Sequence, residues 1–540
     1  MKSSFFNSGM RWSRGFGAES STIKPVAKQR VLVATSFSGN LGALTMESVI
    51  AAALVQRGVD VSALLCDSAL SACIECDHRL YPTSSAQQRL LRLGPKDLCS
   101  SCTRNGQLVY GDQLVPVIYY SEYITEADKG RAAEISRGTP LHNIRDYKLD
   151  GLLAGEHAYA GVLRFYSRGD TLNEPHEEGV VRSYFESALL TVFMMRNLLA
   201  SQRFDVCVLN HGIYVPQGLI AEVCREQGVR VVTWNPAYRR NCFIFSHNDT
   251  YHHTLMNEPI STWEDMCWTD EMEAEIMSYI DSRSEGSRDW IWFHERPEFD
   301  IRRIQSDLGI DLTRPTIGML TNVVWDAQLH YPANAFPGMV EWVMDTISWF
   351  SNHLEMQLVI RIHPAEIRGT VPSRQRILDE ITRNFPILPP NVFIITPESS
   401  ASTYAVMKQC DSVIIYGTKT GVELTSLGIP VIVAGEAWVR NKGITLDASS
   451  VKQYHEFLAA LPIGERMTPQ QTQRARKYAY HFFFRRMIPL PFMHPRKGSP
   501  PYSPVLSSLA QLDVGNFKGL DVICDGILTG SDFVYPAETF

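Results

Sequence analysis

Short apolar runs alternate with helical stretches and glycine-containing polar loops along most of the chain. Runs rich in β-branched residues, such as Arg30–Thr35 and Ser412–Tyr416, have the length of strands that are buried on both faces. Each is followed by a loop and then by a segment of helical character, as in Thr45–Gln56. Strands alternating with helices predict doubly wound α/β sheets. The other expected strands are Val59–Leu65, Phe204–Leu209, Val229–Trp234, Thr316–Leu320, Gln357–Ile362, Asn391–Thr396 and Val431–Val433.

The pattern and the length of 540 residues predict more than one hydrophobic core. We expect two Rossmann-like domains that face each other across a cleft. Tyr184–Leu199, rich in Leu, Met and aromatic residues, is expected to be a core helix of the first. The predicted parts are a flexible tail (1–28), an amino-terminal domain (29–310) with a cysteine-rich insertion (66–105), a carboxyl-terminal domain (311–455), and a helical and irregular segment (456–540) that packs back on the amino-terminal domain.

Composition narrows the class of protein. Hydrophobic residues make up 45% and charged residues 20%, which is typical of a soluble globular chain. A net charge of -7 gives no indication of nucleic-acid binding. No apolar run reaches the roughly 18 to 20 residues that a membrane span needs. Eleven cysteines without an apparent export signal predict a reducing compartment, so we expect a cytoplasmic protein.

The stretch Asp411–Gly435 carries the strongest candidate chemistry. Its strand is followed by Gly417-Thr418-Lys419-Thr420-Gly421, then by a short helix and another strand. Backbone N–H groups and the positive end of a helix dipole converge at such a loop and stabilise an anion. The alternative is an ordinary crossover turn. A cation and two hydroxyls between two glycines favour a ligand site, because a plain turn does not need them.

Two CxxC pairs form the clearest short motif, at Cys73, Cys76, Cys99 and Cys102. Four thiolates in this spacing match a structural zinc site. An iron–sulfur cluster uses the same ligands, and chance pairing is the third interpretation. We predict a structural zinc that clips the insertion to its domain.

Polar residues follow several predicted strands of the amino-terminal half. His211 comes directly after one of these strands, and an imidazole can act as a base near neutral pH. Hydrogen-bonded structural histidines are the alternative for any one of them. Further candidates at these loops are His247 and Asp249 for catalysis, and Ser38, Gly39, Asn40, Asn235 and Tyr238 for acceptor binding.

Several segments resemble the capsule polysaccharide biosynthesis proteins, glycosyltransferases of the GT-B fold that are related to Kdo and sialic acid transferases. The resemblance covers most of residues 30 to 490 and does not identify the sugar. It is carried by Arg361–Glu366 (RIHPAE), Tyr416–Gly435, Ala437–Gly443 (AWVRNKG), Tyr478–Leu490, Asn210–Gly218 and Phe245–His253.

The resemblance implies a nucleotide-sugar site in the carboxyl-terminal half. A His-Pro pair lies near the donor phosphate in related transferases, and Glu423 has the spacing of a residue that holds the donor ribose. The family's acidic pair before a glycine is missing here, which makes His211 the first candidate for the base, followed by Asp249 and His247. The expected donor-binding residues are Arg361, His363, Pro364, Gly417, Thr418, Lys419, Thr420, Gly421, Glu423, Arg440 and Lys442.

We therefore expect a glycosyltransferase that transfers a sugar to a polysaccharide or glycolipid acceptor with inversion of the anomeric configuration. We expect no catalytic metal, because the sequence has no persuasive DxD motif. Two alternatives stay open: a nucleotide-sugar epimerase on the same scaffold, or a catalytically silent nucleotide- or glycan-binding subunit. The aromatic run Phe482–Met487 is expected to pack in the protein, with peripheral contact at the inner face of the plasma membrane as its alternative.

Overall fold

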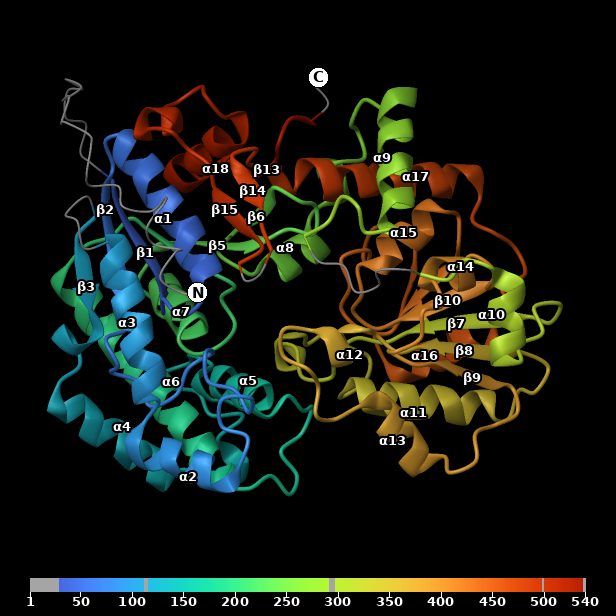
Figure 1. Cartoon of the computed structure of the whole chain (residues 1–540), viewed down its shortest axis with the longest axis horizontal. Helices are drawn as coiled ribbons and strands as arrows, with labels where there is room; N and C mark the ends of the chain where they lie inside the picture. Colours follow the sequence, from blue (N-terminus) through green and yellow to red (C-terminus); the bar gives the residue numbers. More distant parts are fainter. Residues whose placement is uncertain (1–28, 111–114, 291–296, 498–499, 538–540) are drawn as a thin grey trace. The chain divides into compact units, whose positions relative to one another are not determined.

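The computed structural model describes residues 29–110, 115–290, 297–497 and 500–537 (Figure 1). The chain divides into two compact units. The described part of the first unit comprises residues 29–166, Thr171–Tyr251 and Arg486–Tyr535, and the second is built mainly from His252–Arg485. The predicted boundary at residue 310 is therefore displaced, and residues 252–310 belong to the second unit.

The first unit is built on a seven-stranded sheet in the order β13-β6-β5-β4-β1-β2-β3. The pairs from β5 to β3 are parallel, whereas β6 is antiparallel to both of its neighbours. A separate antiparallel pair joins β14 to β15. The strands are β1 (Arg30–Ser36), β2 (Asp60–Leu65), β3 (Val117–Tyr119), β4 (Val206–Asn210), β5 (Arg230–Pro236), β6 (Cys242–His247), β13 (Ile488–Pro489), β14 (Met493–Pro495) and β15 (Tyr502–Pro504).

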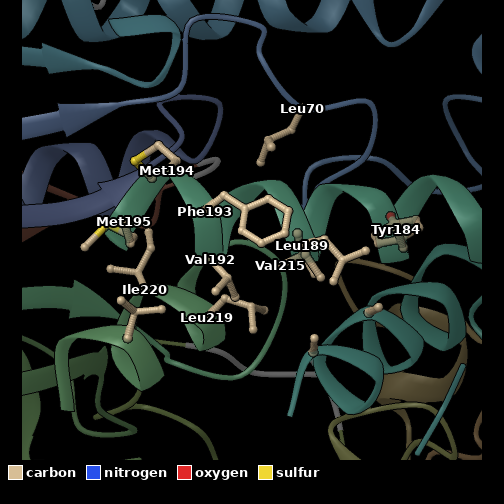
Figure 2. Packing of buried hydrophobic residues seen from close by; sticks show 14 of the residues in the cluster. Leu70, Tyr184, Leu189, Val192, Phe193, Met194, Met195, Val215, Leu219 and Ile220 are labelled. Atoms are coloured by element: carbon tan, nitrogen blue, oxygen red, sulfur yellow. The ribbon is translucent and has the colours of Figure 1, made fainter. Parts of the chain in front are cut away.

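Helices cover the sheet of the first unit in two groups. One group contacts α1 and the other contacts α6, the buried helix that the sequence predicts. Figure 2 shows α6 between Leu70 on one side and Val215 and Leu219 on the other, with Phe193 directed towards Leu70. The helices are α1 (Leu41–Gln56), α2 (Ser84–Leu93), α3 (Lys96–Tyr110), α4 (Glu126–Gly138), α5 (Ala154–Tyr166), α6 (Glu177–Ser201), α7 (Gln217–Glu226) and α18 (Lys518–Thr529).

The second unit contains a six-stranded, wholly parallel sheet in the order β12-β11-β10-β7-β8-β9. Its strands read as near-continuous apolar runs because helices cover both faces. The strands are β7 (Thr316–Leu320), β8 (Gln357–Arg361), β9 (Val392–Ile395), β10 (Ser412–Ile415), β11 (Val431–Val433) and β12 (Leu446–Asp447).

Two helix layers flank this sheet (Figure 1). The layer with α11 and α16 contains the main core, and the layer with α15 is extended by α17 and α9. Because α9 packs on α17, and α10 packs on β9 and α14, both helices belong to this unit. The helices are α8 (Tyr251–Asn257), α9 (Asp270–Arg283), α10 (Ile301–Leu308), α11 (Met339–Phe350), α12 (Ala365–Arg368), α13 (Ile377–Asn384), α14 (Thr403–Met407), α15 (Thr420–Ser426), α16 (Val451–Ala459) and α17 (Pro469–Tyr480).

The carboxyl-terminal segment returns to the first unit later than predicted. Residues 456–485 belong to the second unit, and only from Arg486 onward does the chain join the first, where β13 pairs with β6. Phe482, Phe483 and Phe484 are at most 4% exposed, so this aromatic run is core. Among the described helices, none combines the length and apolarity that crossing a membrane requires.

Both units share the doubly wound topology that the sequence predicts. In each sheet the chain builds outward from one central strand and then returns to that strand's other side. The order therefore reverses between β1 and β4 in the first unit and between β7 and β10 in the second. In open α/β sheets, ligands bind outside the carboxyl ends of the strands at this switch point. The cleft between the units stays a prediction.

Candidate functional site

The predicted donor loop lies at the switch point of the second unit. It follows β10 and leads into α15, and Thr418 accepts a hydrogen bond from the Thr420 N–H at 3.4 Å. A Cβ on Gly417 would lie 2.9 Å from the Glu436 carbonyl oxygen, and one on Gly421 2.6 Å from Ile415. Gly417 is therefore needed where the loop passes close to the backbone, and a side chain at Gly421 would require Ile415 to move.

Lys419 and Glu423 form part of a buried ionic cluster. Glu423 is fully buried, and its Oε1 lies 2.7 Å from Arg283 Nε and 3.2 Å from Lys419 Nζ. The Tyr404 hydroxyl donates to the other oxygen, and Arg283 also pairs with Asp289 at 2.6 Å. Burial opposes ionisation of Glu423, but the charges of Arg283 and Lys419 outweigh it and lower its pKa. A ribose-holding role for Glu423 stays a prediction, and its observed partners tie the donor loop to α9.

The other predicted cations are also enclosed by the second unit. Arg361 is 2% exposed and donates to the carbonyls of Thr396 at 2.6 Å and Ser399 at 3.3 Å. Burial lowers its pKa to about 10. Arg440 donates to the Gly435 carbonyl at 3.0 Å, and Lys442 to the Glu258 carbonyl at 2.9 Å. In this structure these three cations brace loops around the sheet.

His363 is held differently. Its backbone N–H donates to the Thr321 hydroxyl at 3.1 Å, which places it beside the end of β7. Pro364 follows as the residue before α12, and the Ala365 N–H donates to His363 Nδ1 at 3.0 Å. Since Nδ1 accepts, the neutral ring carries its proton on Nε2. The half-buried imidazole is thus oriented with Nε2 as a donor.

A histidine–carboxylate group near the donor loop was not among the predicted sites. Glu436 is 1% exposed, and its Oε2 lies 3.5 Å from His252 Nε2 and 3.4 Å from His253 Nε2. Although burial opposes ionisation, the two nearby imidazoles and a hydrogen bond from the Ala333 N–H lower the pKa of Glu436 to about 2. The Glu436 carbonyl is the atom that a Cβ on Gly417 would approach. The doublet His252-His253 was the available sequence signal.

A surface pocket of about 710 Å³ lies elsewhere on the second unit. Its lining includes Lys408, which precedes β10, and Gly428, which precedes β11. Arg466, which follows α16, also lines it. The pocket therefore borders the amino ends of β10 and β11. Arg466 donates to the Lys408 and Cys410 carbonyls at 2.9 Å. We place the candidate site at the carboxyl ends instead, where the topology and the donor loop coincide.

In the first unit, His211 lies directly after β4 at the switch point. Its φ of +69° is in the left-handed region, which is uncommon for a residue with a side chain, and Gly212 follows with a φ of +88°. The His211 N–H donates to the Trp234 carbonyl at 3.1 Å, and its ring centre lies 5.3 Å from that of Tyr214. The half-buried imidazole is therefore fixed at the edge where ligands of such sheets bind.

A buried carboxyl, which the sequence did not predict as a site residue, lies against the carboxyl ends of the strands near His211. Glu47 on α1 accepts hydrogen bonds from the Thr35 hydroxyl and from Trp234 Nε1, the latter at 3.0 Å. The Thr35 hydroxyl in turn accepts from the Asn210 N–H at 2.8 Å. Burial raises the pKa of Glu47 to about 7 despite these bonds. Glu47 thus joins the ends of β1, β4 and β5.

Asn235 and Tyr238 follow at the end of β5. Asn235 is 9% exposed, and its Nδ2 has no hydrogen-bond partner among the described residues. Tyr238 is half-buried in the turn between β5 and β6. An unsatisfied buried amide at a ligand-binding edge is a candidate contact for a bound hydroxyl.

His247 does not lie at the same end of the sheet as His211. Because β6 is antiparallel, its carboxyl-terminal His247 pairs with Val232 near the start of β5, and its Nε2 lies 2.8 Å from the Ser531 carbonyl. The end of β6, and His247 with it, therefore lies at the opposite edge of the sheet from His211. The chain then turns back, and the Asp249 carbonyl accepts from the Thr233 hydroxyl at 2.6 Å.

The predicted acceptor loop Ser38–Asn40 follows β1 at the same switch point as His211. Asn40 caps α1, accepting from the Gly42 and Ala43 N–H groups at 3.0 and 3.1 Å. The Ser38 N–H donates to Cys102 Sγ at 2.9 Å, so the cysteine-rich segment contacts this loop. Glu75, between the first two cysteines, also lies against it, and burial raises its pKa to about 7 against the nearby Arg164 charge.

The four predicted zinc ligands gather in the first unit. Cys73 and Cys76 lie on the loop before α2, and Cys99 and Cys102 lie on α3. Burial and, to a lesser extent, the charge of Cys73 raise the pKa of the Cys99 thiol to about 11. No three of these sulfur atoms come within 4.8 Å of one another in the described chain. Sulfur atoms around zinc lie about 3.8 Å apart, so binding requires them to close further.

The comparisons with known proteins come from structure alone, since no protein-family profile and no curated protein matches the chain. The beta Kdo 2,4 transferase KpsC of Thermosulfurimonas dismutans aligns with 51% of this chain and 79% of its own, at 11% identity and a TM-score of 0.35. A putative UDP-N-acetylglucosamine 2-epimerase from Listeria monocytogenes covers 94% of this chain and 97% of its own, at 10% identity and a TM-score of 0.28.

The alpha,alpha-trehalose 6-phosphate synthase of Burkholderia multivorans is also similar, with 84% of this chain and 95% of that one aligned. Its identity is 12% and its TM-score 0.30. At similarities this distant, the function has to be argued from the site itself.

Proposed function

We propose that the chain is a glycosyltransferase of the GT-B type, which moves a sugar from a nucleotide-activated donor to a hydroxyl of a polysaccharide or glycolipid. The resemblance of Arg361–Glu366 and Tyr416–Gly435 to capsule polysaccharide biosynthesis proteins supports the proposal. The observation that carries it is the position of His363 just after β8, where its backbone N–H donates to the Thr321 hydroxyl at the end of β7 and its Nδ1 accepts the Ala365 N–H.

The proposed role of the second unit is to bind the donor phosphates. His363 Nε2–H and the hydroxyls of Thr418 and Thr420 donate hydrogen bonds to phosphate oxygens. These bonds strengthen as negative charge accumulates on the departing nucleotide, so they favour the transition state over the bound substrate. The Arg283–Glu423–Lys419 cluster fixes the loop that presents the hydroxyls.

The proposed role of the first unit is to activate the acceptor. His211 removes the proton from the acceptor hydroxyl as its oxygen forms a bond to the anomeric carbon. The bond between that carbon and the nucleotide phosphate breaks with its electron pair on the phosphate, so the anomeric configuration inverts. The left-handed backbone and the Trp234 carbonyl hold His211 in place for this step.

A structural zinc held by Cys73, Cys76, Cys99 and Cys102 is part of the proposal. The donor set suits zinc, and the presence of both CxxC pairs in the first unit, on the loop before α2 and on α3, supports it. The metal would fasten the loop before α2 to α3, and no chemical step is assigned to it.

Nucleotide binding tests the donor role. We expect one of CMP, UDP and GDP to raise the melting temperature of the protein, because a ligand that binds only the folded state stabilises it by mass action. His363→Ala is expected to abolish most of this rise, whereas His142→Ala, at an exposed histidine, leaves it unchanged. A rise that His363→Ala retains in full would contradict the donor role of His363.

Turnover of the matching nucleotide sugar separates the enzyme classes. A transferase releases the nucleotide faster when an acceptor is present, whereas an epimerase interconverts donors without one. A silent binding subunit does neither, although it still shows nucleotide stabilisation.

A further inference from the structure

The loop that carries the first CxxC pair is anchored beside His211. The Ile74 N–H donates to the Val215 carbonyl at 3.0 Å, and Val215 lies four residues after His211. The Tyr184 hydroxyl of α6 donates to the Cys73 and Cys76 carbonyls at 3.0 and 3.2 Å. These bonds fix the backbone on both sides of Glu75, so the direction of its side chain is determined by the fold.

Glu75 extends from this loop onto the loop that follows β1. A Cβ built on Gly39 would lie 2.5 Å from Glu75 Oε2 and 3.0 Å from its Cδ. The glycine therefore leaves the space that the carboxylate occupies. The end of β1 and the end of β4 flank the switch point of this sheet, so Glu75 and His211 approach the same ligand-binding edge from two different segments.

A cation and an aromatic ring connect these two residues. The Arg164 charge acts on the Glu75 carboxylate, and the Arg164 guanidinium lies 5.9 Å from the centre of the Tyr214 ring. That ring centre is in turn 5.3 Å from the His211 ring. Among the described residues, none donates a hydrogen bond to the half-buried Glu75 carboxylate, which leaves its oxygens able to accept from a ligand.

We infer that Glu75 is a hydroxyl-binding residue of the first unit, where its carboxylate accepts hydrogen bonds from the sugar acceptor next to His211. Two carboxylate oxygens suit the two hydroxyls of a vicinal diol, and Arg164 balances the charge. The assignment of a sugar rests on the proposed function. The role is one of binding and orientation. It also gives the cysteine-rich segment a role, which is to bring an acidic residue to the loop that follows β1.

Direct binding of simple glycosides tests the inference without the donor. The probes are the methyl α- and β-glycosides of glucose, galactose, mannose and N-acetylglucosamine, titrated into the full-length protein and followed by ligand-observed NMR. Glu75→Gln keeps the shape of the side chain and removes its charge, so a merely structural role would survive it. We expect on the order of tenfold weaker binding, as for loss of a hydrogen bond to a charged group.

Gly39→Ala provides a second, independent variant, because the added methyl displaces the carboxylate without altering it. We expect a similar loss of affinity. The matched controls are Glu126→Gln, at an exposed glutamate, and Gly130→Ala, where the methyl meets no atom within 4 Å. Both are expected to bind as the unchanged protein does.

Two outcomes would overturn the inference. Unchanged glycoside affinity in both Glu75→Gln and Gly39→Ala would remove Glu75 from the site. Failure of the unchanged protein to bind any of these glycosides would remove the sugar-hydroxyl site itself. Stabilisation by nucleotide is measured on the same samples, so failure of this inference is distinguished from failure of the donor role.

Discussion

The two switch points differ in the kind of polar group that they hold. In the second unit, Arg361, Arg440 and Lys442 all donate to backbone carbonyls, and Lys419 is paired with Glu423. In the first unit, the edge combines a strained His211 with the Asn235 amide, whose Nδ2 lacks a partner in the described chain. Cations in a motif are therefore poor evidence of a ligand by themselves, because a fold also uses them to hold loops in place.

The difference also separates two kinds of function. A rigid, internally paired loop suits recognition of one fixed group such as a phosphate. An edge that holds strained or unsatisfied groups is where chemistry is more often found. The following changes test this contrast, and they are ordered by the size of the expected effect.

The largest effect is expected from breaking the buried cluster of the second unit. Arg283→Met leaves Glu423 and Asp289 as buried charges without their shared cation, which destabilises proteins by about 3–5 kcal/mol. Arg303→Met is the control, since its side chain is 69% exposed and its ion pair is worth about 0–1 kcal/mol. Chemical denaturation measures the unfolding free energy of both variants. Equal losses of stability would mean that the cluster does not hold the donor loop.

A pH-dependent effect is expected from Glu47 in the first unit. Its pKa is raised from 4.5 to about 7, so the folded state binds this proton more tightly than the unfolded state does. Its contribution to stability is complete below about pH 4.5 and is lost as the pH rises through 7, a change of about 3 kcal/mol.

Glu47→Gln removes this titrating group. We therefore expect the difference in unfolding free energy between the protein and the variant to change across that pH window. Denaturation at a series of pH values measures it, and two parallel pH profiles would show that Glu47 is not protonated in the fold.

Metal binding gives the next effect. If Cys73, Cys76, Cys99 and Cys102 close on zinc, a free concentration of one hundred times Kd stabilises the fold by roughly 2.7 kcal/mol. Elemental analysis is expected to find one zinc per chain, and chelation is expected to lower the melting temperature. Cys410→Ser, at a thiol outside the group, should keep the metal. A protein without stoichiometric zinc or iron, whose melting temperature ignores zinc, would end this prediction.

The smallest effect concerns Asn40, which was predicted to contact the acceptor. Because it caps α1, Asn40→Ala is expected to cost about 1 kcal/mol of stability. Asn40→Asp retains an oxygen that accepts hydrogen bonds from the same two N–H groups, so this variant should keep most of the stability. If Asn40→Asp loses acceptor binding but keeps its stability, Asn40 belongs to the acceptor site.

The fold could be read from the sequence because burial on both faces leaves a strong pattern. The strands around Arg30–Thr35 and Ser412–Tyr416 and the core helix at Tyr184–Leu199 are confirmed by β1, β10 and α6. The boundary between the two units was harder to predict. The helices α9 and α10 precede the second sheet in sequence, yet they pack on α17, β9 and α14, which come later in the chain.

The sites were predictable only in part. Strand ends and glycine loops are local signals, and these indicated His211 and the donor loop. The partners that determine what each residue does come from distant segments. Arg283 lies 140 residues before Glu423, and Glu47 lies 187 residues before Trp234. No local pattern contains such pairings. The antiparallel direction of β6, which separates His247 from His211, is likewise a property of the whole sheet.

The central claim is that the second unit holds the donor while the first carries the chemistry. It is tested most directly by measuring nucleotide affinity and acceptor-dependent transfer in His363→Asn and His211→Asn. We predict that His363→Asn weakens the nucleotide and transfer together. His211→Asn should retain nucleotide affinity and lose transfer by about 10²–10⁴-fold, as expected for a general base. A His211→Asn protein with undiminished turnover, or with lost nucleotide binding, would contradict the account.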